Sequence, residues 1–493
     1  MSAQARHTRE VPGAKELAGA RVAVVGLGKS GMACVDALRG LTEATVSAWD
    51  SQSEALDRVG DVDERGADLD AATLAEKVLA WKPDIVIPAP AIPEIGPLFE
   101  GASRAGVPLW SEIELAWRLK ACRDGRAAPW LCVTGTNGKT TTVSMTEAIL
   151  DAAGMAGKAV GNVGNPAVTE VSRVDEEAAG AFAVELSSFQ LRTTTSLSPL
   201  ASICLNIADD HLEWHGSREA YWRAKANVYN RVRAACVYPV GEAAVQRMVD
   251  EADVVEGARA IGLTLGVPSA GQIGMVEDVV VDRAFGPNRF REAVELFSVK
   301  DLSRLAPAGG DLPAHIVRDA MAAAALARAA GTEPSHVRDA LRAFHPGAHR
   351  IELVASAGGV SYVDDSKATN AHAARASLGA QSDGSTVWIV GGLAKGSRFE
   401  ELVGDVVKKL RAVIVIGVDQ DPWRSALAGL DIPVVYIDPA SQAPMDEAVA
   451  SARSHARPGD TVLLAPACAS MDQFASYAER GNRFAEAARR IDG

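Results

Sequence analysis

The segment VTGTNGKTTT (Val133–Thr142) has the residues of a phosphate-binding loop. It follows the apolar run WLCV and opens a stretch of helical character. In such a loop the backbone amides surround phosphate oxygens, the lysine (Lys139) reaches the β- and γ-phosphates, and the next hydroxyl (Thr140) can bind Mg²⁺. The loop departs from the G-x-x-x-x-G-K-[ST] form, because Val133 stands at the first glycine position. The segment predicts a site for a nucleoside triphosphate.

A second glycine pattern, Gly26-Leu-Gly28-Lys-Ser-Gly31, lies between the run RVAVVG and another helical stretch. Glycines at this place let the backbone approach a diphosphate, and the helix start supplies N–H donors and positive potential. Asp50 ends the next apolar run, where an acidic residue can bond a ribose hydroxyl. The pattern alone fits NAD, FAD or a UDP group. Together the two loops suggest one nucleotide as the energy source and another as a handle on the substrate.

Short β-branched runs alternate with alanine-rich helical stretches, which indicates parallel sheets covered by helices on both faces. The runs are RVAVVG, ATVSAWD, DIVIPAP, WLCVTG, AFAVEL, ASICLNI, TVWIVGG, AVIVIG and TVLLAPA. The fold class is therefore α/β. Breaks at ACRDGRAAP and HPGAH divide the chain into residues 1–120, with a polar extension over 1–19, residues 121–346 and residues 347–493. Three domains also suit a chain of 493 residues at about 150 residues a domain.

The chain has 50 basic and 63 acidic side chains, which gives a formal charge of −13. This balance argues against a general nucleic-acid or membrane-surface binder, because both need a positive face. The sequence has no apolar run of the ~18 residues that a membrane span needs, and its start lacks the apolar core of a signal peptide. The six cysteines form no C-x-x-C pair, so we expect reduced, mostly buried thiols and a cytoplasmic protein.

Together with TGTNGKT, several further segments resemble motifs of the Mur ligases, the ATP-dependent amino-acid-adding enzymes of peptidoglycan precursor synthesis. These segments are GNVGNP, VELSSFQL, NIADDHLEWHG, YWRAKANVY, AHR, DDSKATN and LAPACASMDQF. The resemblance runs from about Arg21 to the end of the chain. The combination of VELSSFQL, DSKATN and PACASMDQF is similar to the members of the family that add D-glutamate.

The resemblance implies an N-terminal Rossmann-like sugar-nucleotide domain, a central P-loop ATPase-type domain and a C-terminal Rossmann-like lid domain that closes over the ligands. It implies a monomeric ligase whose partners are UDP-N-acetylmuramoyl-L-alanine, D-glutamate and ATP, with Mg²⁺ as cofactor. In the implied reaction, a carboxylate takes the γ-phosphoryl group to become an acyl phosphate, and the amine of D-glutamate then displaces phosphate. Two anions must meet in the first step, so catalysis needs positive charge and positioning.

The resemblance also assigns residues of this chain to each ligand. ATP is expected at Gly135, Thr136, Asn137, Gly138, Lys139, Thr140, Thr141, Arg350, Asp365 and Lys367. The UDP-sugar is expected at Gly26, Gly28, Lys29, Ser30, Asp50, Ser51 and Asn162. D-Glutamate is expected at Thr369, Lys395, Ser470 and Tyr477. The residues expected to be catalytic are Lys139, Glu185, His211 and Lys225.

A metal site is expected at Thr140, Glu185, His211 and Lys225. Glu185 ends the run AFAVEL and is a hard oxygen donor suited to Mg²⁺, and His211 follows the run ASICLNI. Lys225 lies in a helical stretch. In the family the matching lysine is carbamylated by CO₂, which turns a cation into an anion able to position magnesium. We therefore expect a carbamate on Lys225.

The chain departs from the family pattern at nucleotide contacts. Ala89 replaces a serine near the uracil site, and Tyr477 replaces a phenylalanine near the glutamate pocket. The GxHN segment for adenine and ribose is here GGDLPAHIVRDA, in which His315 and Asp319 could substitute. Alternatives are another Mur-type ligase, a folylpolyglutamate synthase-like enzyme, an NAD- or FAD-dependent redox protein and a non-catalytic nucleotide-binding scaffold. The redox alternative leaves TGTNGKTT unexplained, and a folylpolyglutamate synthase should not need the loop Gly26–Gly31.

Overall fold

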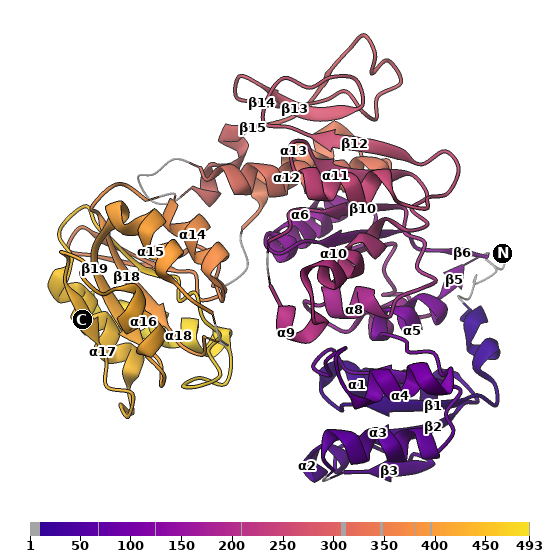
Figure 1. Cartoon of the computed structure of the whole chain (residues 1–493). Helices are drawn as coiled ribbons and strands as arrows, with labels where there is room; N and C mark the ends of the chain where they lie inside the picture. Colours follow the sequence, from indigo (N-terminus) through magenta and orange to yellow (C-terminus); the bar gives the residue numbers. More distant parts are fainter. Residues whose placement is uncertain are drawn as a thin grey trace, which may run out of the picture. The chain divides into compact units, whose positions relative to one another are not determined.

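The computed structural model describes residues 10–67, 69–123, 125–208, 210–306, 312–345, 349–379, 381–394 and 397–492. The chain divides into two compact units (Figure 1). One unit consists of Met1–Ser298 and Arg318–Leu341, and the other of Val299–Val317 and Arg342–Gly493. Both units are built from helices and mainly parallel sheets, which confirms the predicted fold class. The domain boundaries at 120/121 and 346/347 stay predictions.

The first sheet of unit 1, here called the N-terminal sheet, is parallel throughout the described residues. Its strand order is β3 (Glu64–Gly66), β2 (Thr45–Trp49), β1 (Arg21–Val25) and β4 (Ile85–Pro88). The helical segments along this part of the chain are η1 (Pro12–Leu17), α1 (Lys29–Leu41), α2 (Ser53–Leu56), α3 (Ala71–Ala80), α4 (Pro97–Ala105) and α5 (Glu112–Arg118).

Alternate residues of β1 enter two different hydrophobic cores. Val22 and Val24 belong to a core that includes side chains of α1, whereas Ala23 and Val25 belong to one that includes side chains of α3 and α4. A strand buried on both faces reads as a continuous apolar run, which explains why RVAVVG is recognisable in the sequence.

The second sheet of unit 1, the central sheet, has the strand order β15-β14-β13-β12-β11-β10-β7-β9-β8. Its strands are β7 (Trp130–Thr134), β8 (Gly157–Gly161), β9 (Ala181–Glu185), β10 (Ala201–Cys204), β11 (Ala235–Pro239), β12 (Arg259–Leu263), β13 (Gln272–Val276), β14 (Val279–Asp282) and β15 (Val294–Ser298). The seven strands from β13 to β8 in this order, which include β7, are parallel to their neighbours. Strands β14 and β15 extend the sheet with antiparallel pairings. The predicted break at ACRDGRAAP contains a small antiparallel pair, β5 (Cys122–Arg123) and β6 (Arg126–Ala127).

Helices surround the parallel part of the central sheet (Figure 1). They are α6 (Lys139–Ala152), α7 (Ala167–Val171), α8 (Ser188–Arg192), α9 (Leu212–His215), α10 (Arg218–Ala226), η2 (Asn227–Tyr229) and α11 (Ala243–Asp250). Of three later helical segments, η3 (Val299–Leu305) lies in unit 2. The helices α12 (Ala314–Ala329) and α13 (Pro334–Ala343) each cross a border between the units along the chain. In α12 the residues from Ala320 to Ala327 are all at most 1% exposed.

The sheet of unit 2, the C-terminal sheet, has the order β16 (Glu352–Ala357), β17 (Val360–Asp364), β21 (Thr461–Leu464), β18 (Thr386–Gly391), β19 (Leu410–Ile416) and β20 (Val434–Tyr436). Only β16 among its described strands runs antiparallel to its neighbour. The helices of this unit are α14 (Ala371–Gly379), α15 (Glu400–Val406), η4 (Val407–Lys409), α16 (Asp421–Ala426), α17 (Pro444–His455), α18 (Tyr477–Arg489) and η5 (Arg490–Asp492). Separate cores cover the two faces of the sheet.

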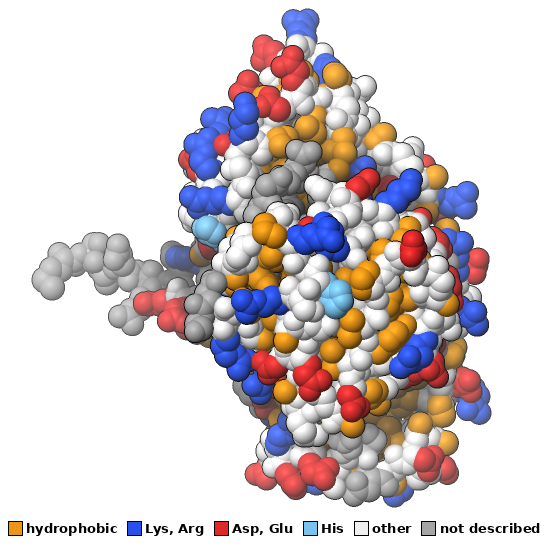
Figure 2. All heavy atoms as spheres, turned by 90° about the vertical axis from the view of Figure 1, so that its left-hand side faces the viewer, with side chains coloured by type: hydrophobic (Ala, Val, Ile, Leu, Met, Phe, Trp, Pro, Cys, Tyr) orange, Lys and Arg blue, Asp and Glu red, His pale blue; other side chains and the backbone are white. Residues whose placement is uncertain are grey.

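The surface and the thiols agree with the composition. On the face shown in Figure 2, basic and acidic side chains are interspersed with hydrophobic ones. All six cysteines are free thiols, and all except the half-buried Cys122 are buried, as predicted. Throughout the part of the chain that the structure describes, every helix is too short or too polar to cross a bilayer.

Candidate functional site

The predicted phosphate-binding loop joins β7 to α6. Gly135 and Gly138 both have positive φ angles, 147° and 81°. A Cβ at Gly138 would overlap Oδ1 of Asp319 on α12, so only glycine fits both the space and the backbone conformation there. The ammonium of Lys139 donates to the carbonyl oxygens of Gly135 and Thr136, at 2.9 and 3.0 Å. The loop therefore forms a narrow turn with a cation folded over it, which suits a phosphate chain.

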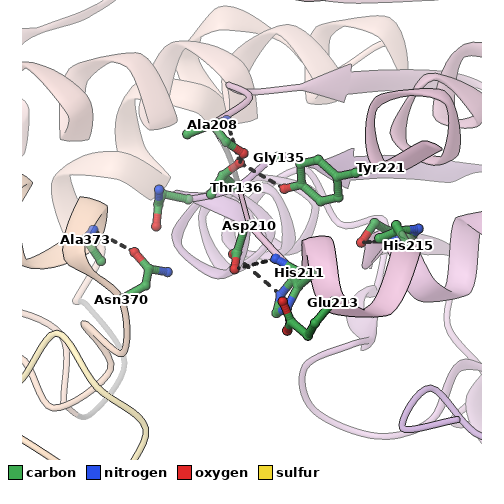
Figure 3. A network of polar contacts seen from close by, with 12 residues as sticks. Gly135, Thr136, Ala208, Asp210, His211, Glu213, His215, Tyr221, Asn370 and Ala373 are labelled. Atoms are coloured by element: carbon green, nitrogen blue, oxygen red, sulfur yellow. Dashed lines mark hydrogen bonds and ion pairs between the residues drawn. The ribbon is translucent and has the colours of Figure 1, made fainter. Parts of the chain in front are cut away.

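Two residues from other elements brace this loop. The side-chain oxygen of Asn206, which follows β10, accepts from the amides of Thr136 and Asn137 at 3.1 and 2.9 Å. The Thr136 hydroxyl lies 3.1 Å from the Tyr221 hydroxyl and accepts from the Ala208 amide at 3.0 Å (Figure 3). The loop conformation thus depends on the segment after β10 and on α10.

The predicted metal carboxylate, Glu185, stands at the end of β9 and is 2% exposed. Its Oε2 accepts from the Thr140 hydroxyl at 2.7 Å, and its Oε1 accepts from the Asn162 amide at 2.8 Å. The structure therefore brings together three residues that the sequence predicted separately. Carboxylate, hydroxyl and amide oxygens beside a phosphate loop are the donors that Mg²⁺ prefers, so the residues present fit this ion.

Lys225 lies in α10 and is 2% exposed. Its ammonium donates to the Gly135 carbonyl oxygen at 2.8 Å, the same oxygen that accepts from Lys139. Burial, together with the positive charge of Lys139, lowers the pKa of Lys225 to about 7. A buried amine that loses its proton near neutral pH is a plain consequence of this environment.

His211 precedes α9 and has a left-handed backbone, with φ of 52°. Its Nε2 lies 3.5 Å from Oδ2 of Asp210, and its Nδ1 lies 4.0 Å from Oε1 of Glu213 (Figure 3). The His211 ring also contacts the Phe189 ring. Burial lowers the pKa of His211, while the neighbouring carboxylates raise it. A neutral imidazole is the form that binds metals.

The first glycine loop, between β1 and α1, is also tightly built. A Cβ at Gly31 would overlap the Gly26 carbonyl oxygen. Oδ2 of Asp50 accepts from the Leu27 amide at 2.6 Å, so this carboxylate holds the loop itself. Lys29 is exposed, and its ammonium donates to the Gly164 carbonyl oxygen at 2.6 Å. Ser30 lies beside Lys29 in the first turn of α1, and Ser51 follows β2.

In unit 2, two of the predicted nucleotide residues, Asp365 and Lys367, follow β17, and Arg350 precedes β16. Asp365 is 7% exposed, and its Oδ2 accepts a hydrogen bond from the Ser377 hydroxyl of α14. Burial raises the pKa of Asp365 to about 7, and the charge of Arg350 opposes that rise.

Two of the residues predicted for D-glutamate, Tyr477 and Thr369, contact Lys367, which was predicted for ATP. The Lys367 ammonium lies 3.7 Å from the centre of the Tyr477 ring, at the start of α18. Thr369 is two residues further along the same loop, and its amide donates to the Lys367 carbonyl oxygen. Ser470 is 3% exposed in the segment after β21. Lys395 lies outside the described residues.

Comparison with known proteins agrees with this geometry. The family description "Mur ligase middle domain" matches residues 133–260, and "Mur ligase, glutamate ligase domain" matches residues 349–468. A relative from Streptomyces coelicolor, named UDP-N-acetylmuramoylalanine–D-glutamate ligase, is 47% identical over 97% of this chain and 99% of its own. One of the same name from Thermobifida fusca is 43% identical over 97% of this chain and 100% of its own. The chain belongs to the Mur ligase family.

Solved structures of Mur ligases share the fold. UDP-N-acetylmuramate-alanine ligase MurC from Thermotoga maritima aligns with a TM-score of 0.54 and 17% identity, over 96% of this chain and 99% of its own. MurF ligase from the same organism, solved in complex with ADP, aligns with a TM-score of 0.54 and 15% identity, over 97% and 96%.

Several residues of this Mur ligase that support the site were not singled out from the sequence. Arg480 of α18 is fully buried and donates to both Ser366 and the carbonyl oxygen of Cys468, which joins two loops of the unit 2 site. Nδ1 of His349 lies 2.6 Å from Oδ2 of Asp364, directly before Arg350 and Asp365. His349 and Asp364 lie in the segments AHR and DDSKATN, which the sequence had already marked as motifs. Arg480 lies in no such segment.

Proposed function

We propose that this Mur ligase uses ATP to join D-glutamate to UDP-N-acetylmuramoyl-L-alanine, as a step of peptidoglycan precursor synthesis. One observation carries the proposal: relatives with that name match almost the whole chain, at 47% and 48% identity for the two Streptomyces proteins. Beside the phosphate loop, Thr140 and Asn162 are hydrogen-bonded to Glu185. These three side chains support the proposal, because they offer the polar groups that phosphoryl transfer needs.

The reaction has two steps. The carboxylate of the alanyl group attacks the γ-phosphorus of ATP, the bond to ADP breaks, and an acyl phosphate forms. The amine of D-glutamate then attacks the acyl carbon, an amide forms, inorganic phosphate leaves, and the amine loses a proton to solvent or to a nearby base. Lys139 would neutralise the phosphate chain, and the loop glycines would let the backbone amides approach it.

Magnesium would be held by Thr140 and Glu185, with His211 as a further ligand, and when bound it would reduce the repulsion between the two reacting anions. Asn162 donates to Glu185 and so fixes the direction of its carboxylate. In unit 2, Arg350, Asp365 and Lys367 belong to the proposed ATP site. Thr369, Lys395, Ser470 and Tyr477 are proposed for D-glutamate, and Gly26, Gly28, Lys29, Ser30, Asp50 and Ser51 for the UDP-sugar.

We also propose that Lys225 reacts with CO₂ to form a carbamate. Only a neutral amine attacks CO₂, and the pKa of about 7 leaves much of Lys225 neutral at physiological pH. The nitrogen gains a carboxylate and loses a proton, so the group changes from cation to anion. NMR with ¹³C-labelled CO₂ should show a carbamate signal that is missing in Lys225→Ala. A variant that keeps full activity and ignores added bicarbonate would contradict this role.

The experiment that tests the function is phosphate release from ATP with UDP-N-acetylmuramoyl-L-alanine, Mg²⁺ and one amino acid at a time. D-Glutamate should stimulate release strongly, while L-glutamate, L-alanine and diaminopimelate should not. Lys139→Met should abolish the stimulated rate, and Lys77→Met, at an exposed position on α3, should leave it unchanged. Stimulation by another amino acid, or by none, would overturn the proposal.

A further inference from the structure

Helix α7 begins without a cap of its own. Its N-cap residue is Pro166, whose side chain has no atom that could accept from the first amides of the helix. The first amides of a helix have no partner within the helix, so something else must accept from them. In this protein the acceptor is Oε1 of Glu112, which takes a hydrogen bond from the Val168 amide at 2.7 Å. Glu112 is the first residue of α5, far away in the sequence.

The segment held by this cap is the loop that carries Asn162. The loop lies between β8 and α7, and the Gly161 amide donates back to the Asn165 carbonyl oxygen at 3.1 Å. At its other end, the backbone amide of Asn162 donates to the Glu185 carbonyl oxygen at 2.9 Å, and its side chain donates to Oε1 of Glu185. A displacement of α7 would therefore be passed through only a few residues to the magnesium carboxylate.

The same loop has a second attachment, which comes from helix α1. The ammonium of Lys29, at the first turn of α1, donates to the carbonyl oxygen of Gly164 at 2.6 Å. Both attachments, from α1 and from α5, thus come from the part of the chain that contains the first glycine loop. The loop 162–166 connects that part with Glu185.

Glu112 occupies a place that is costly for a carboxylate. It is 3% exposed, and among the described residues its Oε2 has no hydrogen-bond partner. Burial raises the pKa of Glu112 to about 7, against the effect of the α7 amides. A serine or asparagine at position 166 would cap α7 locally and without a buried acid. The chain instead has proline there and takes its cap from another element.

We propose that Glu112 is a positioning residue for the ligase reaction, which holds α7 and thereby sets the direction of Asn162 and Glu185. This inference rests on the proposed function for the meaning of the site, but the contact itself can be tested without it. Loss of the hydrogen bond from Val168 to Glu112 should weaken the binding of magnesium and of the muramoyl nucleotide. The phosphate loop, braced by Asn206 and Tyr221, should bind ATP as before.

Two variants remove the contact from opposite sides. Glu112→Leu deletes the acceptor, and Val168→Pro deletes the donor at a helix position where proline is tolerated. Each should raise the KM for the muramoyl nucleotide and the half-saturating Mg²⁺ concentration about tenfold, the size expected for one charge-assisted hydrogen bond. The KM for ATP should change less than twofold. Glu112→Gln keeps an acceptor oxygen and should behave like the original protein.

Hydrogen exchange measured by mass spectrometry gives a readout that does not depend on activity. Peptides covering residues 162–169 should exchange faster in both deleting variants than in the original protein. Glu114→Leu is the matched control: Glu114 is a buried carboxylate of the same helix and accepts from the Thr195 and Ser196 amides at 2.7 and 2.8 Å. It should destabilise the protein without changing the magnesium or muramoyl-nucleotide dependence.

Unchanged exchange over 162–169 in both deleting variants, or equal effects of Glu112→Leu and Glu114→Leu on every parameter, would overturn the positioning role. So would Glu112→Gln behaving like Glu112→Leu. If the original protein shows no D-glutamate-dependent phosphate release, the proposed function fails instead, and the exchange experiment still decides whether Glu112 holds the loop.

Discussion

Asp365 provides a quantitative test of the electrostatics of unit 2. This carboxyl is buried after β17, and its pKa is raised to about 7, with burial as the main cause. In an unfolded chain the same group has a pKa near 3.9. Between these values the folded protein keeps the proton and the unfolded chain releases it, so a rise in pH favours unfolding. The stabilisation that Asp365 adds to the free energy of unfolding is fully present below about pH 4. It is lost progressively as the pH rises towards 7, and it does not change further at higher pH.

The substitution Asp365→Asn removes the titration and nearly keeps the shape. A pKa difference of about 3 units corresponds to roughly 4 kcal/mol over the whole range, and to about 2 kcal/mol between pH 5 and pH 7. The free energy of unfolding of the variant, relative to the original protein, should therefore increase by about 2 kcal/mol over that interval. At the same time the variant should bind ATP more weakly, because Asp365 belongs to the proposed nucleotide site.

Urea unfolding followed at pH 5, 6, 7 and 8 measures the effect. Trp388 and Trp423 are fully buried in unit 2 and contact each other, so both contribute to the fluorescence change when this unit unfolds. Asp431→Asn, at an exposed position of the same unit, is the control and should run parallel to the original protein at every pH. Curves for Asp365→Asn that also stay parallel would refute the raised pKa.

Three further substitutions test other parts of the site. Gly138→Ala should weaken ATP binding roughly 5- to 30-fold in titration calorimetry, because the left-handed backbone costs about 1–2 kcal/mol and the new methyl group meets Asp319. Arg480→Met should lower the free energy of unfolding of unit 2 by about 3 kcal/mol, since buried carbonyl oxygens lose a charged donor; an unchanged melting temperature would contradict this. Asn162→Ala should raise the Mg²⁺ concentration for half-maximal rate about tenfold, because Glu185 loses one of its two side-chain hydrogen-bond donors. The maximal rate at saturating Mg²⁺ should equal that of the original protein. An unchanged Mg²⁺ dependence would contradict this prediction.

The two glycine loops were predictable because their geometry can be met by few residue types. At Gly138 a positive φ and the nearby Asp319 leave room for no side chain, and at Gly31 the Gly26 carbonyl oxygen does the same. The parallel strands were predictable for a related reason, because a strand that is buried on both faces has apolar residues at consecutive positions. Glu185 could be predicted from its place at the end of such a run.

The residues that hold these loops were less predictable. Asn206 and Glu112 act on backbone amides of distant segments, and nothing in their local sequence shows which amides those are. Arg480 is one of several arginines in α18, and only the packed structure shows that it is the buried one. The antiparallel edge of the central sheet, β13 to β15, was not predicted, because its strands are short and contain no long apolar run.

Helix α12 carries Asp319 to the phosphate loop and has no outward face over its next two turns. From Ala320 to Ala327 six of eight side chains are alanines, and none of the eight is more than 1% exposed. A larger side chain at any of these alanines would have to displace neighbours, at a cost of about 1–3 kcal/mol. Amino-acid changes should therefore be strongly depleted along this stretch in any collection of functional variants.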